Sequence, residues 1–172
     1  MARGRGQGWE EKTQHPVFAK YLQNQGFEFF HELPINIDIF RNHAKRSRID
    51  FVVVHPQCLE LVECKNGFHP SYQLAQAIGA LLVYRSLILI ESNYPEIIPK
   101  RNIIRLSICT INGYKSEKGN DEWTDAHDKL IRNIEKTIHE NIGVYLVQPK
   151  SEKKATKQYW NNIKCQKVVV HK

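Results

Sequence analysis

The chain has 172 residues, of which 41% are hydrophobic and 25% are charged. This composition is typical of one globular domain with a full hydrophobic core and excludes a disordered or fibrous protein. There is no secretory signal peptide and no apolar run long enough to cross a membrane, so we expect a cytoplasmic protein, associated with the nucleoid if it binds DNA. The absence of a P-loop or a G-x-G-x-x-G motif argues against an ATP-driven enzyme.

The charge of the chain is uneven. Its net charge is +7, which suggests an anionic partner and nucleic acid first. Residues 149–172 contain seven lysines and one glutamate, so most of the net positive charge lies there. Such a tail either contacts nucleic acid or is a solvated end. We therefore expect a flexible basic N-terminus over residues 1–8, a single α/β domain over 9–148 and a basic extension over 149–172.

A helix and a strand are predicted first. Apolar residues at helical spacing follow Pro16, which suits a first helical turn, and Gly26 is a good stop. We interpret His15, which precedes that proline, as a helix-start residue rather than a ligand. Residues 27–33 read as a strand that Pro34 interrupts. Alternation would place the side chains of this strand on two faces. One face would carry Phe27, Phe29, His31 and Leu33, and the other Glu28, Phe30 and Glu32.

Residues 48–65 predict a β-hairpin. Two apolar strands flank Pro56 and Gln57, which are turn residues. With that pair at the centre of the turn, Asp50 faces Glu63, and facing Cβ atoms are about 4.5–5.5 Å apart. Period two then places Lys65 on the same face as Glu63.

This arrangement predicts a metal centre. Two facing carboxylates repel each other unless a cation lies between them, and carboxylate oxygens suit a hard ion such as Mg²⁺. A lysine beside the ion, here Lys65, can orient the attacking water or offset charge in the transition state of phosphodiester hydrolysis. The alternative is an exposed strand end with an ordinary Lys–Glu pair, since E-x-K triplets occur elsewhere in the chain.

A basic loop over residues 42–48 leads directly to Asp50. Lys45, Arg46 and Arg48 would lie at the mouth of the predicted centre. Such residues bind phosphate without reading sequence. The alternative is a solvated loop.

The rest of the chain predicts further helices and strands. We expect a helix from Pro70 to about Tyr84, a short buried strand over residues 87–90 and a strand over 103–111. A long helix follows, capped by Thr124 or Asp121 and ended by Gly143. Residues 143–147 read as a strand, and the last segment either adds a strand or binds a partner.

Asp50 and the triplet Glu63-Cys64-Lys65 together resemble the core motif of the PD-(D/E)XK nuclease superfamily. The basic run before Asp50 is similar to that of archaeal Holliday-junction resolvases, although Ile49 replaces the usual proline. The resemblance covers roughly residues 10–110. It implies an α/β fold with a restriction-endonuclease-like αβββαβ core, in which helices flank a central mixed β-sheet, followed here by a C-terminal helix/strand extension.

The resemblance also implies a Mg²⁺-dependent endonuclease that hydrolyses DNA, with Mn²⁺ as a substitute. Asp50, Glu63 and the main-chain carbonyl of Cys64 would hold the metal, and Lys65 would activate water. A glutamine on the following helix points into the site in related branches, which suggests Gln73 or its rival Gln76. Such nucleases carry a further acidic residue on their first helix, for which Glu11 is the candidate here. From the strand pattern, Glu32 either reaches the centre, if its strand end lies beside Asp50, or is an exposed carboxylate. Junction-resolving enzymes act as dimers, so a homo-oligomer is expected.

Two other functions stay open. One is a sequence-specific restriction or homing endonuclease of the same superfamily, in which residues 112–172 would recognise the DNA sequence. The other is a nucleic-acid-binding module that kept the fold without catalysis. Cleavage of a four-way junction, cleavage at one duplex sequence, or binding without cleavage would distinguish these functions.

Overall fold

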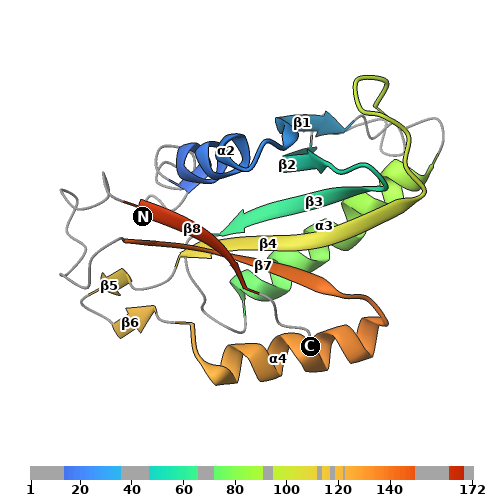
Figure 1. Ribbon diagram of the computed structural model, residues 1–172. Coiled ribbons are helices and arrows are strands. Elements are labelled where there is room, and N and C mark those ends of the chain that lie inside the picture. Colours follow the sequence, from blue (N-terminus) through green and yellow to red (C-terminus); the bar gives the residue numbers. More distant parts are fainter. Residues whose placement is uncertain are drawn as a thin grey trace, which may run out of the picture.

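The computed structural model describes residues 14–35, 47–65, 72–90, 95–111, 114–116, 119–121, 123–149 and 163–168. In this part of the chain, helices flank a six-stranded mixed sheet, and a small two-stranded sheet lies apart from it (Figure 1). The predicted α/β class with a central mixed sheet is therefore confirmed. The predictions for residues 1–8, Glu11, Lys45 and Arg46 lie outside the described residues.

The large sheet has the strand order β1-β2-β3-β4-β7-β8. The first three strands pair antiparallel, β3, β4 and β7 pair parallel, and β8 pairs antiparallel with β7. The small sheet pairs β5 with β6. The strands are β1 (Glu28–Ile35), β2 (Ser47–Val54), β3 (Cys58–Lys65), β4 (Ile103–Ile111), β5 (Tyr114–Ser116), β6 (Gly119–Asp121), β7 (Ile142–Pro149) and β8 (Ile163–Val168).

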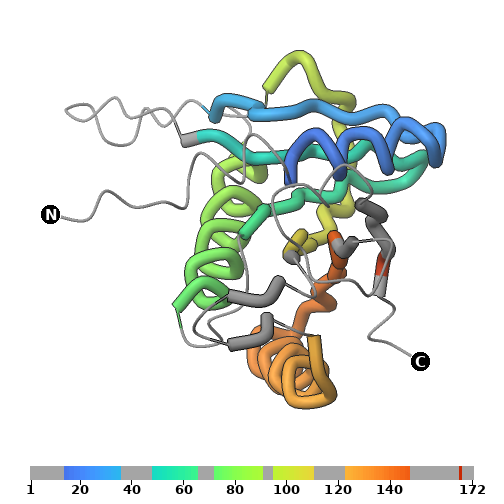
Figure 2. The backbone as a smooth tube through the Cα atoms, turned by 90° about the vertical axis from the view of Figure 1, so that its left-hand side faces the viewer, coloured from blue at the N-terminus to red at the C-terminus, as the bar shows by residue number. Residues whose placement is uncertain are grey.

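Helices cover both faces of the large sheet. α2 (His15–Asn24) packs on one face through Phe18 and Leu22, while α3 (Gln73–Leu89) and α4 (Asp125–Ile138) pack on the other (Figure 2). Each face thus has its own apolar core, as expected where parallel strands lie at the centre of a sheet. None of the helices in the described ranges is long and apolar enough to span a membrane.

The hairpin register is confirmed. Val54 lies opposite Leu59, and Phe51 lies opposite Val62. The His55 N–H donates to the Cys58 carbonyl at 2.9 Å and closes the predicted turn. One position beyond Phe51, the Asp50 carboxylate accepts the backbone N–H of Cys64 at 2.7 Å. Beyond the pair Phe51–Val62, the contact between the Asp50 side chain and the Cys64 backbone therefore joins the two strands at the predicted centre.

Two predictions after the hairpin are wrong. Residues 87–90 do not form a strand, because α3 continues to Leu89 and buries Leu87 and Ile88 in the helix-side core. A short apolar run fits a buried helix as well as a strand. Gly143 does not end a helix either. α4 ends before His139, which has a positive φ of 55°, and Gly143 lies inside β7.

The first strand also differs from prediction. Pro34 lies within β1 rather than interrupting it, because β1 is an edge strand and needs no N–H donor on its open side. Glu32 has a positive φ of 52°, which breaks the alternation of faces. Leu33 consequently packs in the core on the side of α3, away from the face predicted for it and His31.

Candidate metal centre

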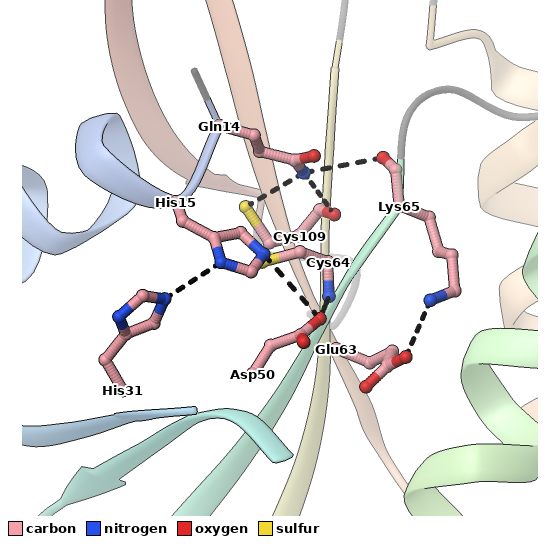
Figure 3. A network of polar contacts seen from close by, with 8 residues as sticks. All are labelled: Gln14, His15, His31, Asp50, Glu63, Cys64, Lys65 and Cys109. Atoms are coloured by element: carbon pink, nitrogen blue, oxygen red, sulfur yellow. Dashed lines mark hydrogen bonds and ion pairs between the residues drawn. The ribbon is translucent and has the colours of Figure 1, made fainter. Parts of the chain in front are cut away.

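The end of the hairpin brings three predicted residues together. Lys65 Nζ donates to Glu63 Oε1 at 2.6 Å, and Asp50 lies beside them on the neighbouring strand (Figure 3). Glu63 is only 6% exposed and Cys64 is fully buried. The alternative of an exposed strand end therefore does not describe this site, although the Lys–Glu pair that it expected is present.

His15 approaches Asp50 from the start of α2. Its Nε2 atom lies 3.9 Å from Asp50 Oδ2, and its Nδ1 atom lies 2.9 Å from His31 Nε2 (Figure 3). The residue is 3% exposed, and Nε2 has no hydrogen-bond partner among the described residues. The prediction that His15 begins a helix is right for its backbone. It missed that the side chain faces the predicted centre.

Gln14 fixes the start of α2 against the sheet. Its Nε2 group donates to the Cys109 carbonyl at 2.7 Å and to the Lys65 carbonyl at 3.4 Å. Its Oε1 atom is buried without a hydrogen-bond partner in the described part of the chain. Buried polar atoms without partners are rare, and each calls for a partner such as a water or an ion, or for a catalytic role. Gln14 and His15 therefore both present such atoms where α2 meets the hairpin.

Burial shifts the pKa values of the titratable groups in this centre. Burial raises the pKa of Asp50 above its usual value, although the Cys64 N–H, His15 and Lys65 favour its charged form. Burial lowers the pKa of His15 despite the nearby Asp50. Burial, followed by the charges of Glu63 and Asp50, raises the pKa of Tyr84 on α3 to about 12. A bound cation would favour the ionised carboxylate and reverse the direction at Asp50.

The side chains present fit a divalent cation. Carboxylate oxygens of Asp50 and Glu63 suit Mg²⁺, and His15 Nε2 lies beside them, 3.9 Å from Asp50 Oδ2. We call Asp50, Glu63, Lys65 and His15 the Asp50 centre. The Cys64 sulfur also lies near His15 and Asp50. Burial raises the pKa of that thiol well above its usual value, so it stays protonated and is a poor ligand.

The other predicted site residues lie around this centre. Arg48 is exposed on the strand that leads to Asp50 and pairs with Glu32 at 3.2 Å. Gln73 begins α3 and is half-buried, and its entry into the site stays a prediction. The same holds for the Cys64 carbonyl as a metal ligand.

A second buried carboxylate was not predicted. Glu60 is 1% exposed and accepts hydrogen bonds from His55 at 2.9 Å and Ser107 at 2.5 Å. Further donors are Tyr145 at 3.0 Å and Lys167 at 2.9 Å. We call these residues the Glu60 centre: Glu60, His55, Ser107, Tyr145 and Lys167.

The partners of Glu60 set its pKa. Burial alone would raise it, but the hydrogen bond from His55, the charge of Lys167 and the Ser107 hydroxyl lower it to about 2. Space for these partners depends on Gly143, since a Cβ there would lie 2.1 Å from Ser107 Oγ. The sequence signal that could have identified Glu60 is its position between apolar residues of β3, a strand that is buried on both faces.

Comparisons with known proteins give a limited result. Neither the known protein families nor the curated proteins contain a match to this chain. Among solved structures, the chain is similar to AF1548, a protein of unknown function, with 18% identity, 75% of this chain and 55% of that chain covered, and a TM-score of 0.40. The chain thus spans about half of AF1548. It is also similar to an FdxN element excision controlling factor protein from Anabaena variabilis, with 14% identity, 76% and 88% coverage, and a TM-score of 0.43.

Proposed function

We propose that the protein is a Mg²⁺-dependent endonuclease of the PD-(D/E)XK type that hydrolyses DNA phosphodiester bonds. The observation that carries the proposal is the Asp50 centre, in which two carboxylates, a lysine and an unpartnered imidazole nitrogen meet at one hairpin end. The element order α2-β1-β2-β3-α3-β4 supports it further, because it agrees with an αβββαβ core.

The proposed mechanism assigns one role to each side chain. Asp50 and Glu63 would hold the cation, with the Cys64 carbonyl as a further ligand. When bound, the cation polarises the phosphate and lowers the pKa of a coordinated water. The Lys65 ammonium, now paired with Glu63, would orient the attacking water and offset charge on the phosphate as it develops. Mn²⁺ would substitute for Mg²⁺ at the same oxygen ligands.

DNA is the proposed substrate because of charge. The net charge of +7 favours a polyanion, and Arg48 is exposed two residues before Asp50, where it can contact backbone phosphate. Lys45, Arg46 and the lysines of residues 149–172 would add further phosphate contacts. A four-way junction is the proposed preferred form, with a homo-oligomer as the acting species.

One observation favours a second candidate, a DNA-binding module without catalysis. Lys65 already offsets the charge of Glu63 at 2.6 Å, so these two residues need no cation to coexist. In that case the chain would bind DNA in a salt-sensitive manner and never cut it.

The test is cleavage of a labelled four-way junction, a linear duplex and a single strand with Mg²⁺, Mn²⁺ or EDTA. We expect metal-dependent cutting that is lost in Asp50→Asn and Lys65→Ala. Lys129→Ala, which removes an exposed lysine of α4, is the matched control and should cut normally. Cutting that persists in EDTA or in both site variants would refute the proposed centre. Binding without cutting on every substrate would favour the module.

A further inference from the structure

The other nitrogen of the His15 ring belongs to a second cluster. His15 Nδ1 lies 2.9 Å from His31 Nε2, and one ligand atom each of His15, His31 and Glu32 lies within 4.8 Å of the others. Neighbouring residues of a strand normally point to opposite faces. The positive φ of Glu32 removes that alternation, so its carboxylate joins the same group as His31.

We propose that His15, His31 and Glu32 form a binding site for a transition-metal ion such as Zn²⁺, separate from the oxygen-rich site of Asp50 and Glu63. Two imidazoles and one carboxylate are a donor set that zinc uses, with an open position for water. Imidazole selects transition metals, whereas carboxylates without nitrogen donors suit Mg²⁺. The two sites would therefore take ions of different chemical classes.

The distance between the two ring nitrogens is close to what this assignment needs. Two nitrogen ligands at about 2.0–2.1 Å from a tetrahedral zinc ion lie about 3.3–3.4 Å apart, so the rings would separate by about 0.4 Å on binding. The observed separation between the two ring nitrogens is 2.9 Å. The same separation fits a hydrogen bond, so the two imidazoles are already held near the geometry that an ion requires.

The site is accessible on the edge of the sheet. His31 is exposed on β1, and the Glu32 side chain is 37% exposed. Within the described residues, Arg48 contacts Glu32 through Oε2, and an exposed pair of this kind contributes little, so a divalent ion could displace it. A non-glycine residue in the left-handed region is strained, and such strain persists where the surroundings or a function require it.

Asp50 lies near the other nitrogen of the His15 ring. An ion bound at His15 Nδ1 leaves the ring proton on Nε2, which faces Asp50 Oδ2 at 3.9 Å. A ligating histidine commonly donates its second N–H to a carboxylate. At 3.9 Å the Asp50 carboxylate is too far for a hydrogen bond and acts on this N–H through its charge. The lone pair of Nε2 is then no longer free for an ion held by Asp50 and Glu63. The statement about the ion of Asp50 and Glu63 rests on the proposed function, whereas zinc binding by His15, His31 and Glu32 does not.

The experiment is a Zn²⁺ titration of the full chain by calorimetry, repeated with Co²⁺ to read nitrogen ligation from its visible absorption bands. We expect His31→Phe and Glu32→Gln each to weaken the binding of one metal equivalent at least tenfold and to remove the Co²⁺ bands. Both side chains are solvent-accessible, so the variants should keep the fold, as circular dichroism would verify.

Two controls separate this site from others. His127→Phe removes a histidine of α4 and should leave the titration unchanged. Glu63→Gln should keep zinc binding while abolishing any Mg²⁺-dependent cleavage. The Zn²⁺ titration therefore tests the zinc site even if the protein proves not to be a nuclease. A loss smaller than tenfold in either His31→Phe or Glu32→Gln, or no Zn²⁺ binding by the full chain, would overturn the inference.

Discussion

Two carboxylates of the same hairpin behave in opposite ways, although burial disfavours the charged form of both. Glu60 accepts hydrogen bonds from four side chains, and these partners lower its pKa to about 2. Asp50 has the N–H of Cys64 and a distant His15, and burial raises its pKa. Burial therefore does not decide the direction of the shift. The number and charge of the partners decide it.

The difference indicates which carboxylate stabilises the fold and which is available to a ligand. Glu60 lies on β3, and its donors come from β4, β7, β8 and the hairpin turn, so this residue joins four strands. The Asp50 centre and the neighbouring Gln14 instead keep buried polar atoms without hydrogen-bond partners in the described ranges, namely His15 Nε2 and Gln14 Oε1. Perturbed groups with incomplete partners are typical of functional sites.

The largest expected effect lies in the activity of the Asp50 centre. Asp50→Asn should reduce cleavage about 10³-fold, because the charge that holds the cation is lost. The free energy of unfolding at neutral pH should not fall, since the fold already disfavours the ionised form of this carboxyl. Parallel cleavage rates and urea denaturation would measure both. A large loss of stability would mean that Asp50 resembles Glu60.

Removing the Glu60 carboxylate should be the largest change in stability. Glu60→Ala leaves the Lys167 ammonium and the Ser107 and Tyr145 hydroxyls without their acceptor, and we expect a loss of about 3–5 kcal/mol. Urea or thermal denaturation would measure it. Glu28→Gln, on the exposed edge strand, is the control and should change stability by less than about 0.5 kcal/mol. A small effect of Glu60→Ala would remove the contrast between the two centres.

The pH dependence of stability should show the same contrast. The pKa of Glu60 falls from its usual 4.5 to about 2 on folding. The unfolded chain therefore binds this proton first, and the contribution is complete above 4.5 and lost as the pH falls towards 2. The contribution of Glu60 to the free energy of unfolding amounts to about 3 kcal/mol. Denaturation of wild type and Glu60→Gln between pH 2 and 6 would measure it, and equal slopes in both proteins would contradict the prediction.

The smallest expected effect concerns the space around Glu60. Gly143→Ala would place a methyl group 2.1 Å from Ser107 Oγ, so we expect a loss of about 1–3 kcal/mol from overpacking. The loss should shrink when Ser107→Ala is also present, because the hydroxyl that clashes is gone. A double-mutant cycle measures this coupling. Additive losses would show that Ser107 does not set the requirement for glycine.

Local patterns predicted much of this molecule. The register from Val54–Leu59 to Phe51–Val62 follows from the Pro56–Gln57 turn and the period of two, both of which can be read from neighbouring residues. The same reasoning brought Asp50, Glu63 and Lys65 together. The boundaries of β4 and the start of α2 followed from equally local signals.

Contacts between distant segments could not be predicted in this way. His15 meets Asp50 only because α2 packs across the hairpin, and no periodicity within either segment shows this. Three of the four donors of Glu60, namely Ser107, Tyr145 and Lys167, come from strands far along the chain. Residues 87–90 were misassigned because α3 is apolar around most of its surface, which hides the stripe that identifies a helix.

The sequence separation of these contacts has a consequence for the order of folding. The Asp50–Cys64 contact spans 14 residues, whereas Glu60 bonds to Tyr145 and Lys167 across 85 and 107 residues. Closing a short loop loses less chain entropy, and a hairpin forms within about 1–10 μs. During refolding, the acids of the hairpin should therefore come together early. Glu60 keeps its hydration until β4, β7 and β8 cover it, so we expect the docking of β8, which supplies Lys167, to be a late step.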